Sequence, residues 1–182
     1  MNNDDWLVPG ATKDQQSVTP NWERRNPCLI DGVVLKDVRH VPTTYGHLTE
    51  LFRKDWELAG NWTQAFQGCF QPGAVSAWHA HAVTQDGIFV NRGMMKIILF
   101  DSRKYSKTFG LLNEFRLGDA RPGLLIVPPC VWHGVHNTSA EEASLVNFVD
   151  HAYSYEDPDH WRLAADSPEI PHRFSTHLRA TS

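Results

Sequence analysis

Hydrophobic residues fall into short runs along most of this chain, and residues that favour turns separate the runs. From Val33 onward the runs are rich in branched and aromatic side chains, which is typical of β-strands. We expect strands over 33–38, 48–53, 63–71, 74–81, 87–90, 94–101, 124–127 and 144–149. The turns between them include Pro72-Gly73, Asn91-Arg92-Gly93, Arg121-Pro122-Gly123 and Pro128-Pro129. This spacing predicts an all-β sandwich or barrel.

One segment near the C-terminus departs from the strand pattern. Residues 156–165 begin with acidic side chains and Pro158, which are favoured in the first turn of a helix. Trp161 and Leu163 or Ala164 could then pack against the strands. We therefore expect one short C-terminal helix on an otherwise all-β domain.

Residues 1–30 have no sustained hydrophobic period. They are rich in Asn, Asp, Gln and Thr and are interrupted by Pro9, Pro20 and Pro27, so the sequence predicts an extended N-terminal arm. The remaining residues, 31–182, are enough for one domain with a hydrophobic core and too few for two. We expect the arm to pack on a second copy of the chain in a two-fold homodimer.

Charge and cysteine content argue against several classes of function. The formal net charge is −4 and the Lys and Arg residues are scattered, whereas a surface that binds nucleic acid needs a basic stripe. Cys28, Cys69 and Cys130 form an odd set without Cys-x-x-Cys spacing; this argues against a disulfide framework and a thiolate zinc site and favours a reducing, cytoplasmic setting. The first residues lack a signal-peptide pattern, and the longest apolar run, Met94–Phe100, contains Lys96. Neither secretion nor membrane spanning is therefore expected.

The residues that carry chemistry are concentrated in two stretches. The first contains Gly73, His79, His81, Asp86 and Gly93, and the second runs from Gly123 through His133 to Asn137. Their spacing resembles the paired motifs of cupins, which are small β-barrels with a double-stranded β-helix, or jelly-roll, topology. Placed face to face, two such strand-turn-strand units would aim three imidazoles and a carboxylate into one cavity. We expect the function to lie there.

A metal site is one interpretation of these residues. His79 and His81 lie two residues apart on an expected strand, so both side chains point to the same face, as a chelating pair requires. With His133 and Asp86 they could bind one divalent first-row metal ion, such as iron, manganese, nickel or zinc. The simpler alternative is that the histidines are ordinary polar lining of a barrel and that Asp86 ends a strand. His136, three residues beyond His133, is expected on the opposite face of its strand.

Aromatic side chains near these motifs allow two interpretations. They could stack on a ring-shaped ligand or simply fill the core, and they are Trp78, Trp132, Phe70 and Phe89. We include Trp78 with His81 and His133 among the candidate substrate-binding residues. Asp166 follows the expected helix, where a returning segment could bring it to the cavity.

Longer stretches resemble one family, the dTDP-4-dehydrorhamnose 3,5-epimerases, over about residues 33–170. Phe100–Gly110 resembles the family's V-D-L-R-x-x-S-P-T-F-G, and Leu125–Gly134 resembles its L-x-I-P-x-G-x-A-H-G. Val75–His79 resembles L-R-G-L-H, and Trp161–Ile170 is similar to the closing W-x-D-P-x-L-x-I. The resemblance implies an epimerase or isomerase that acts on a nucleotide-linked 4-keto-6-deoxy sugar.

The resemblance also implies roles for individual residues. It puts His79 on the family's base, Asp166 on its catalytic aspartate, and Tyr153 near its acidic tyrosine, with Tyr155 as the competing choice. A ketone at C4 acidifies the hydrogens on the neighbouring carbons. A neutral histidine held by a carboxylate can therefore remove one of them, and a tyrosine on the other face can return a proton. This chemistry requires no cofactor.

Two departures from the family keep other functions open. Ser76 replaces the arginine of L-R-G-L-H and Asp86 replaces a lysine that follows the base, so cations for an enolate and a diphosphate are missing where they are expected. The sequence around His79 and His81 also resembles sugar-nucleotide 3,4-ketoisomerases and metal-binding cupins, and a non-catalytic carbohydrate-binding cupin is a third interpretation. The base and the metal interpretations compete for His79, because a nitrogen that gives its lone pair to a metal cannot also accept a proton.

Overall fold

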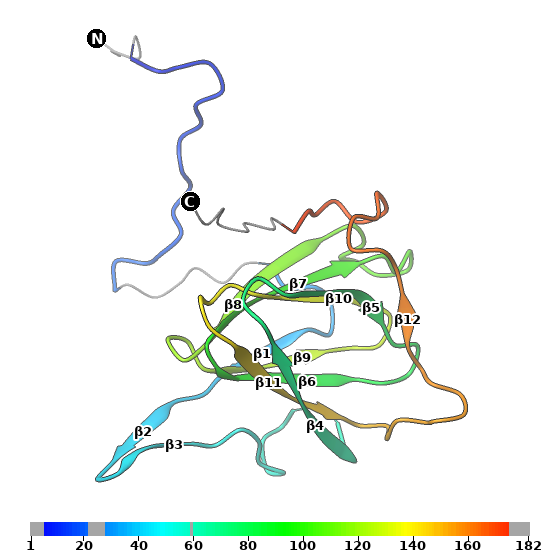
Figure 1. Cartoon of the computed structure of the whole chain (residues 1–182). Helices are drawn as coiled ribbons and strands as arrows, with labels where there is room; N and C mark the ends of the chain where they lie inside the picture. Colours follow the sequence, from blue (N-terminus) through cyan, green and yellow to red (C-terminus); the bar gives the residue numbers. More distant parts are fainter. Residues whose placement is uncertain (1–5, 22–27, 59, 175–182) are drawn as a thin grey trace.

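A computed structural model describes residues 6–21, 28–58 and 60–174. In these residues the chain forms twelve β-strands and no helix (Figure 1). The strands are β1 (Val34–Asp37), β2 (His40–Thr43), β3 (Gly46–Thr49), β4 (Gln64–Phe70), β5 (Val75–Ala80), β6 (Asp86–Arg92), β7 (Met94–Asp101), β8 (Leu112–Gly118), β9 (Gly123–Val127), β10 (Val131–Asn137), β11 (Ala143–Val149) and β12 (Trp161–Arg162).

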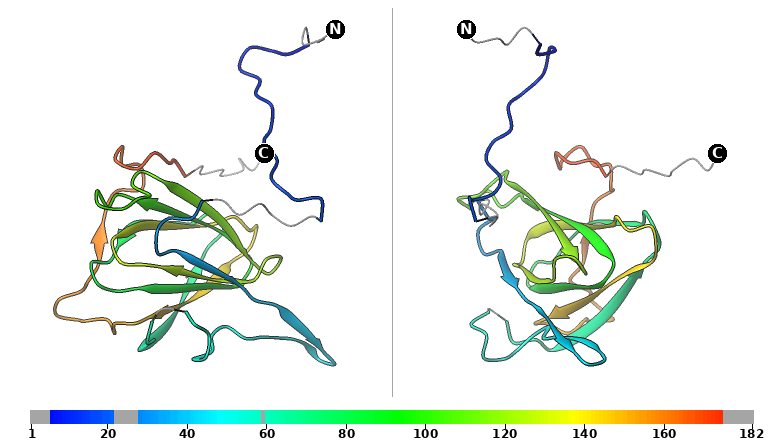
Figure 2. Two further views of the ribbon diagram at one scale, coloured as in Figure 1. Left: turned by 180° about the vertical axis from the view of Figure 1, so that it is seen from behind. Right: turned by 90° about the vertical axis from the view of Figure 1, so that its left-hand side faces the viewer.

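Ten of these strands form two five-stranded antiparallel sheets, and β2 and β3 form a separate hairpin. One sheet has the order β1-β9-β6-β11-β4 and the other has the order β12-β5-β10-β7-β8. From β9 to β11 successive strands alternate between the sheets, so the chain winds around a common interior (Figure 2). This arrangement confirms the predicted all-β jelly roll.

The main hydrophobic core lies between the two sheets. Strand β7 illustrates it, since Met95, Ile97 and Leu99 occupy alternate positions, point to the same face and are fully buried. They pack against inward-facing residues of the opposite sheet, including Leu125 and Val127.

The outer faces of the two sheets are also covered. Trp78 and Ile98 pack with Ile170 of the C-terminal segment. On the other sheet, Phe89 and its apolar neighbours are covered by residues from 51–62. Strands buried on both faces lose the alternation of polar and apolar residues, which explains the continuous apolar runs in β7 and β9.

The predicted C-terminal helix is wrong. Residues 161–162 instead form β12, which pairs with the open edge of β5 in the register Trp161 to Ala80 and Arg162 to His79. Two further bonds between the backbones of Leu163 and Trp78, each 3.0 Å long, extend this pairing. Pairing with the exposed edge of β5 gives its backbone N–H and C=O groups hydrogen-bond partners. The weak helix propensity of a short segment does not outweigh that gain.

Strands that carry several polar residues were not clearly predicted from the sequence. β2 and β8 were not among the expected strands, β10 was expected only as part of the motif around His133, and the run expected at 48–53 corresponds only to the end of β3. In β8 the polar residues Asn113, Glu114 and Arg116 interrupt the apolar pattern.

The N-terminal segment lies apart from the sheets. Residues 6–21 run away from the barrel and contain no strand of either sheet (Figure 1). Part of the proposed arm lies outside the described residues, and the boundary at residue 30 stays a prediction. Among the described residues there is no helix that could cross a membrane.

Candidate active site

Three histidines from two adjacent strands of one sheet meet at the mouth of the barrel. His79 is on β5 and His81 follows that strand directly, while His133 on β10 lies opposite His79 in the strand register. The ring centroids of His79 and His133 are 4.0 Å apart, and those of His81 and His133 are 5.5 Å apart. The structure therefore brings together the three imidazoles that the sequence motifs suggested.

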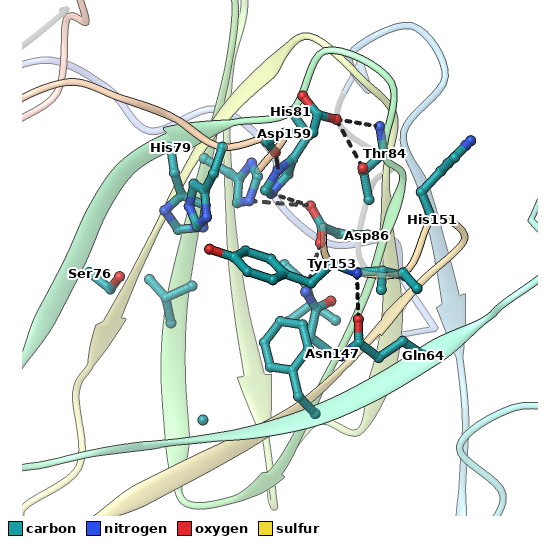
Figure 3. Close-up of a pocket in the computed structure, with 18 of the residues that line it drawn as sticks. Gln64, Ser76, His79, His81, Thr84, Asp86, Asn147, His151, Tyr153 and Asp159 are labelled. Atoms are coloured by element: carbon teal, nitrogen blue, oxygen red, sulfur yellow. Dashed lines mark hydrogen bonds and ion pairs between the residues drawn. The ribbon is translucent and has the colours of Figure 1, made fainter. Parts of the chain in front are cut away.

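Asp86 completes this cluster from the opposite sheet. It is the first residue of β6 and is only 1% exposed. Its Oδ2 atom lies 3.3 Å from His81 Nε2 and 3.4 Å from His133 Nε2. Its other oxygen, Oδ1, accepts a hydrogen bond of 2.7 Å from Asn147 Nδ2 on β11. The carboxylate is thus held from both sides (Figure 3).

In each of the two histidines beside Asp86, the other ring nitrogen, Nδ1, is hydrogen-bonded to a backbone carbonyl oxygen. His81 Nδ1 lies 2.5 Å from the carbonyl oxygen of Asp159, and His133 Nδ1 lies 3.1 Å from that of Val131. These contacts fix the orientation of both rings. Burial lowers the pKa of His133 below its ordinary value, although Asp86 acts in the opposite direction.

His79 is surrounded differently. Its Nδ1 atom is buried and has no hydrogen-bond partner among the described residues. Burial, followed by the nearby rings of His133 and His160, holds the pKa of His79 far below its usual range. The imidazole is therefore neutral at physiological pH, which is the form that can accept a proton.

Asp159 shapes the loop that follows His81. Its carboxylate accepts hydrogen bonds from the backbone nitrogens of Ala82, Val83 and Thr84 and from the Thr84 hydroxyl. Burial alone would raise the pKa of Asp159, but the bonds from Val83, Ala82 and Thr84 lower it to about 2. Asp159 is thus an ionised anchor between the segment before β12 and the turn that leads to Asp86.

The cluster lines a cavity of about 410 Å³ between the two sheets. Apolar side chains form much of its inner wall, including Phe66, Ile88 and Leu145. Tyr153, half-exposed on the segment after β11, lies across the cavity with its hydroxyl directed toward the side of His79 (Figure 3). Its backbone nitrogen donates a hydrogen bond of 2.8 Å to Gln64 Oε1. Tyr155, the competing choice, is 87% exposed and does not line the cavity.

Two of the candidate residues lie elsewhere. Trp78 is fully buried on the outer face of β5, where it packs against Ile98 and Phe174 instead of lining the cavity. The C-terminal segment covers that face, which makes Trp78 a core residue. Asp166 is exposed on the segment after β12 and does not line the cavity either, so the structure does not bring it to His79.

The cavity also contains residues that sequence reasoning missed. His160 comes from a segment expected to be helical, and its ring centroid lies 4.9 Å from that of His81 and 5.3 Å from that of His79. Asn147 had a usable signal, because it interrupts an alternating series of cavity-lining apolar residues on β11. Arg162 is the one arginine or lysine among the described residues that line the cavity. Ser76 lines it as well.

Comparisons with known proteins agree with this architecture. No protein-family model matches the chain. A probable low-salt glycan biosynthesis epimerase of Haloferax volcanii is 33% identical over 139 residues, which are 75% of this chain and 89% of that protein. The spore coat polysaccharide biosynthesis protein SpsL of Bacillus subtilis is 30% identical over 151 residues, which are 83% of this chain and 100% of that protein.

A solved structure extends the likeness to three dimensions. The crystal structure of a dTDP sugar isomerase from Desulfovibrio desulfuricans matches with a TM-score of 0.75 and 27% identity, over 80% of this chain and 92% of that one. Together with the sequence relatives and the motifs around His79 and His133, this shows that the chain belongs to the dTDP-4-dehydrorhamnose 3,5-epimerase family of sugar epimerases and isomerases.

Proposed function

We propose that this protein is an epimerase or isomerase of a nucleotide-linked 4-keto-6-deoxy sugar, with His79 as the base. One observation carries the proposal. His79 lines a cavity between the sheets with a neutral imidazole, and its buried Nδ1 atom makes no hydrogen bond among the described residues. A neutral imidazole on a cavity wall is available to take a proton from a bound substrate.

The reaction follows from the acidity of carbon next to a ketone. His79 removes a proton from a carbon adjacent to C4, and the electron pair of the broken C–H bond moves to the carbonyl oxygen to give an enolate. Tyr153 then donates a proton to the same carbon from the opposite face, which inverts the stereocentre. The position of the Tyr153 hydroxyl, facing the side of His79, supports this pairing (Figure 3).

The lining of the cavity fits a substrate whose sugar ring lies inside the cavity and whose charged diphosphate lies toward the solvent. Its inner wall is mostly apolar, which suits the deoxygenated C6 methyl end of such a sugar. Ser76 and Asp86 stand where the family's cations are expected. We therefore assign contact with the negatively charged diphosphate to Arg162, which is exposed on β12.

Proton transfer through His79 and Tyr153 requires no organic cofactor. For the whole protein we propose a homodimer and a cytoplasmic setting. The odd set Cys28, Cys69 and Cys130, without Cys-x-x-Cys spacing, is the sequence basis for that setting. Light scattering of the purified chain at micromolar concentration tests the dimer, and a monomer there would refute it.

The proposed activity is tested by incubating the protein with a dTDP-4-keto-6-deoxyhexose and following the product by NMR. We expect an epimerised 4-keto sugar. Inversion at both carbons next to the ketone identifies a 3,5-epimerase, and inversion at one identifies a single-centre epimerase. A carbonyl that moves to C3 identifies a ketoisomerase. Recovery of unchanged substrate from folded protein, with several sugar nucleotides tried, would contradict the proposal and favour a binding protein.

A further inference from the structure

His81, Asp86 and His133 form an arrangement of donor atoms that the proposed reaction does not use. One ring nitrogen of each histidine and a carboxylate oxygen of Asp86 all lie within 4.8 Å of one another. The two histidines belong to one sheet and Asp86 to the other. All three side chains are largely withdrawn from solvent, with His133 at 2% exposed and Asp86 at 1%.

The protonation of these groups follows from their other contacts. A backbone carbonyl oxygen can only accept a hydrogen bond, so Nδ1 of His81 and Nδ1 of His133 carry the protons that point at Asp159 and Val131. In a neutral ring, Nε2 is then left with a lone pair. A carboxylate oxygen is also only an acceptor when ionised. Three lone pairs therefore face one another at a buried point.

Three such donor atoms at one buried point are suited to a cation that all of them can coordinate. One divalent ion satisfies all three donors at once, and two histidines with one carboxylate are a ligand set used for zinc and iron.

The spacing and the surroundings fit an ion as well. Ligand atoms about 2.1 Å from one tetrahedral ion lie about 3.4 Å from each other, and the two nitrogens lie 3.3 and 3.4 Å from Asp86 Oδ2. Metal-bound histidines usually donate their second nitrogen to a carbonyl or carboxylate, and metal-bound carboxylates are usually hydrogen-bonded too. The carbonyls of Asp159 and Val131 and the amide of Asn147 supply these contacts.

We propose that His81, Asp86 and His133 bind one divalent first-row metal ion, while His79 remains free to act as the base. The sequence left the metal and the base in competition for His79. The structure removes that competition, because the three converging donors do not include His79. When bound, such an ion would supply positive charge next to the sugar carbonyl, where the family's arginine and lysine are absent. That catalytic part rests on the proposed function, whereas ion binding does not.

The test measures ion binding without any substrate. Protein purified without chelator is analysed for metal content, then stripped and titrated separately with Zn²⁺ and Mn²⁺ by calorimetry. We expect about one ion per chain and a rise in the thermal midpoint of about 5–10 °C at a hundredfold excess over Kd. Because the readouts are stoichiometry and melting of the wild-type protein, they do not depend on a variant that folds poorly.

Variants then locate the site. His81→Ala and Asp86→Asn should weaken binding by more than about 100-fold, and Asn147→Ala by about 10- to 100-fold. His151→Ala is the matched control, since His151 lines the same cavity but pairs with Asp150 on an exposed loop. The affinity of this variant for the metal ion should equal that of the wild type.

Two results would overturn the proposal. The first is wild-type protein that binds neither ion, and the second is binding that survives in both His81→Ala and Asp86→Asn. An ion bound as expected, in a protein that turns over no 4-keto sugar nucleotide, would support the metal site while refuting the proposed function.

Discussion

The side-chain amide of Asn147 donates a hydrogen bond of 2.7 Å to Oδ1 of Asp86, and both residues are buried. This contact joins two neighbouring strands, β11 and β6, of the same sheet. It also decides which carboxylate oxygen faces His81 and His133, because Oδ1 is occupied and Oδ2 is left for the histidines. A residue outside the recognised motifs thus orients the central carboxylate of the site.

Removing that amide should destabilise the protein. Asn147→Ala leaves a buried carboxylate oxygen without its donor, so we expect a loss of about 1–3 kcal/mol in the free energy of unfolding, measured by urea denaturation. The exposed Asn61 provides the control, since Asn61→Ala should change stability by less than about 0.5 kcal/mol. Equal, small effects of the two substitutions would show that the bond to Asp86 contributes nothing.

The lowered pKa of Asp101 leads to a prediction of how the free energy of unfolding depends on pH. Asp101 is fully buried at the end of β7 and accepts hydrogen bonds from Arg103, Ser106 and Thr108, which close the loop before β8. Burial alone would raise the pKa of Asp101, but these bonds outweigh it and hold the pKa well below the ordinary value. A depressed pKa means that the stabilisation is complete above the unfolded-state pKa, about 3.9, and is lost as the pH falls through the lower folded-state pKa.

The free energy of unfolding should therefore fall steeply below about pH 4 in the wild type. Asp101→Asn should be less stable at pH 7 and should show a shallower fall between pH 4 and pH 2, because the titrating group is gone. Urea titrations at a series of pH values measure both effects. Asp14→Asn, at an exposed position, should reproduce the wild-type slope; a steep acid transition retained in Asp101→Asn would assign that transition to other groups.

Arg162 should affect substrate binding more than the chemical step. It is exposed, lines the cavity, and lies opposite His79 in the pairing of β12 with β5. If it holds the diphosphate equally in the ground state and the transition state, Arg162→Ala should raise KM about tenfold and leave kcat nearly unchanged. Arg116→Ala, at the one exposed position of β8 and outside the cavity lining, should change neither constant. A fall in kcat at constant KM would instead place Arg162 in the transition state.

The roles of Tyr153 and His79 can be distinguished by measuring solvent deuterium exchange and inversion of the stereocentre separately. Tyr153→Phe removes the proposed acid but leaves the base, so deuterium from D₂O should still enter the carbon next to the ketone while inversion is suppressed. Mass spectrometry measures the first and NMR of the sugar measures the second. Inversion at the wild-type rate in Tyr153→Phe would exclude Tyr153 as the acid, and Tyr155→Phe is the matched control because that ring does not line the cavity.

Sequence reasoning reached the centre of the site because local rules were sufficient there. The two-residue spacing of His79 and His81 fixes a shared face on any strand, and the matched motif around His133 predicted a second strand-turn-strand unit facing the first. Asp86 followed from the same motif spacing. These residues converge in the structure as the pattern indicated.

The residues that were missed depend on contacts between distant segments. His160 and Arg162 reach the cavity because their segment pairs with the edge of β5, and no local pattern distinguishes that from a short helix. Trp78 lies beside His79 in the sequence, but strand alternation turns it outward, under the C-terminal segment around Ile170. Local residue propensities predict many of the strands. Which segment pairs with an open strand edge depends on contacts between residues that are distant in the sequence.

The central claim is that His79 removes a proton from carbon next to the ketone. Its most direct test is incubation of wild type, His79→Asn and Asp166→Asn with a dTDP-4-keto-6-deoxyhexose in D₂O, with deuterium in the sugar followed by mass spectrometry. We predict rapid incorporation by the wild type and none by folded His79→Asn. Since Asp166 is exposed and does not line the cavity, Asp166→Asn should incorporate deuterium as the wild type does. Incorporation at the wild-type rate by His79→Asn would contradict the account.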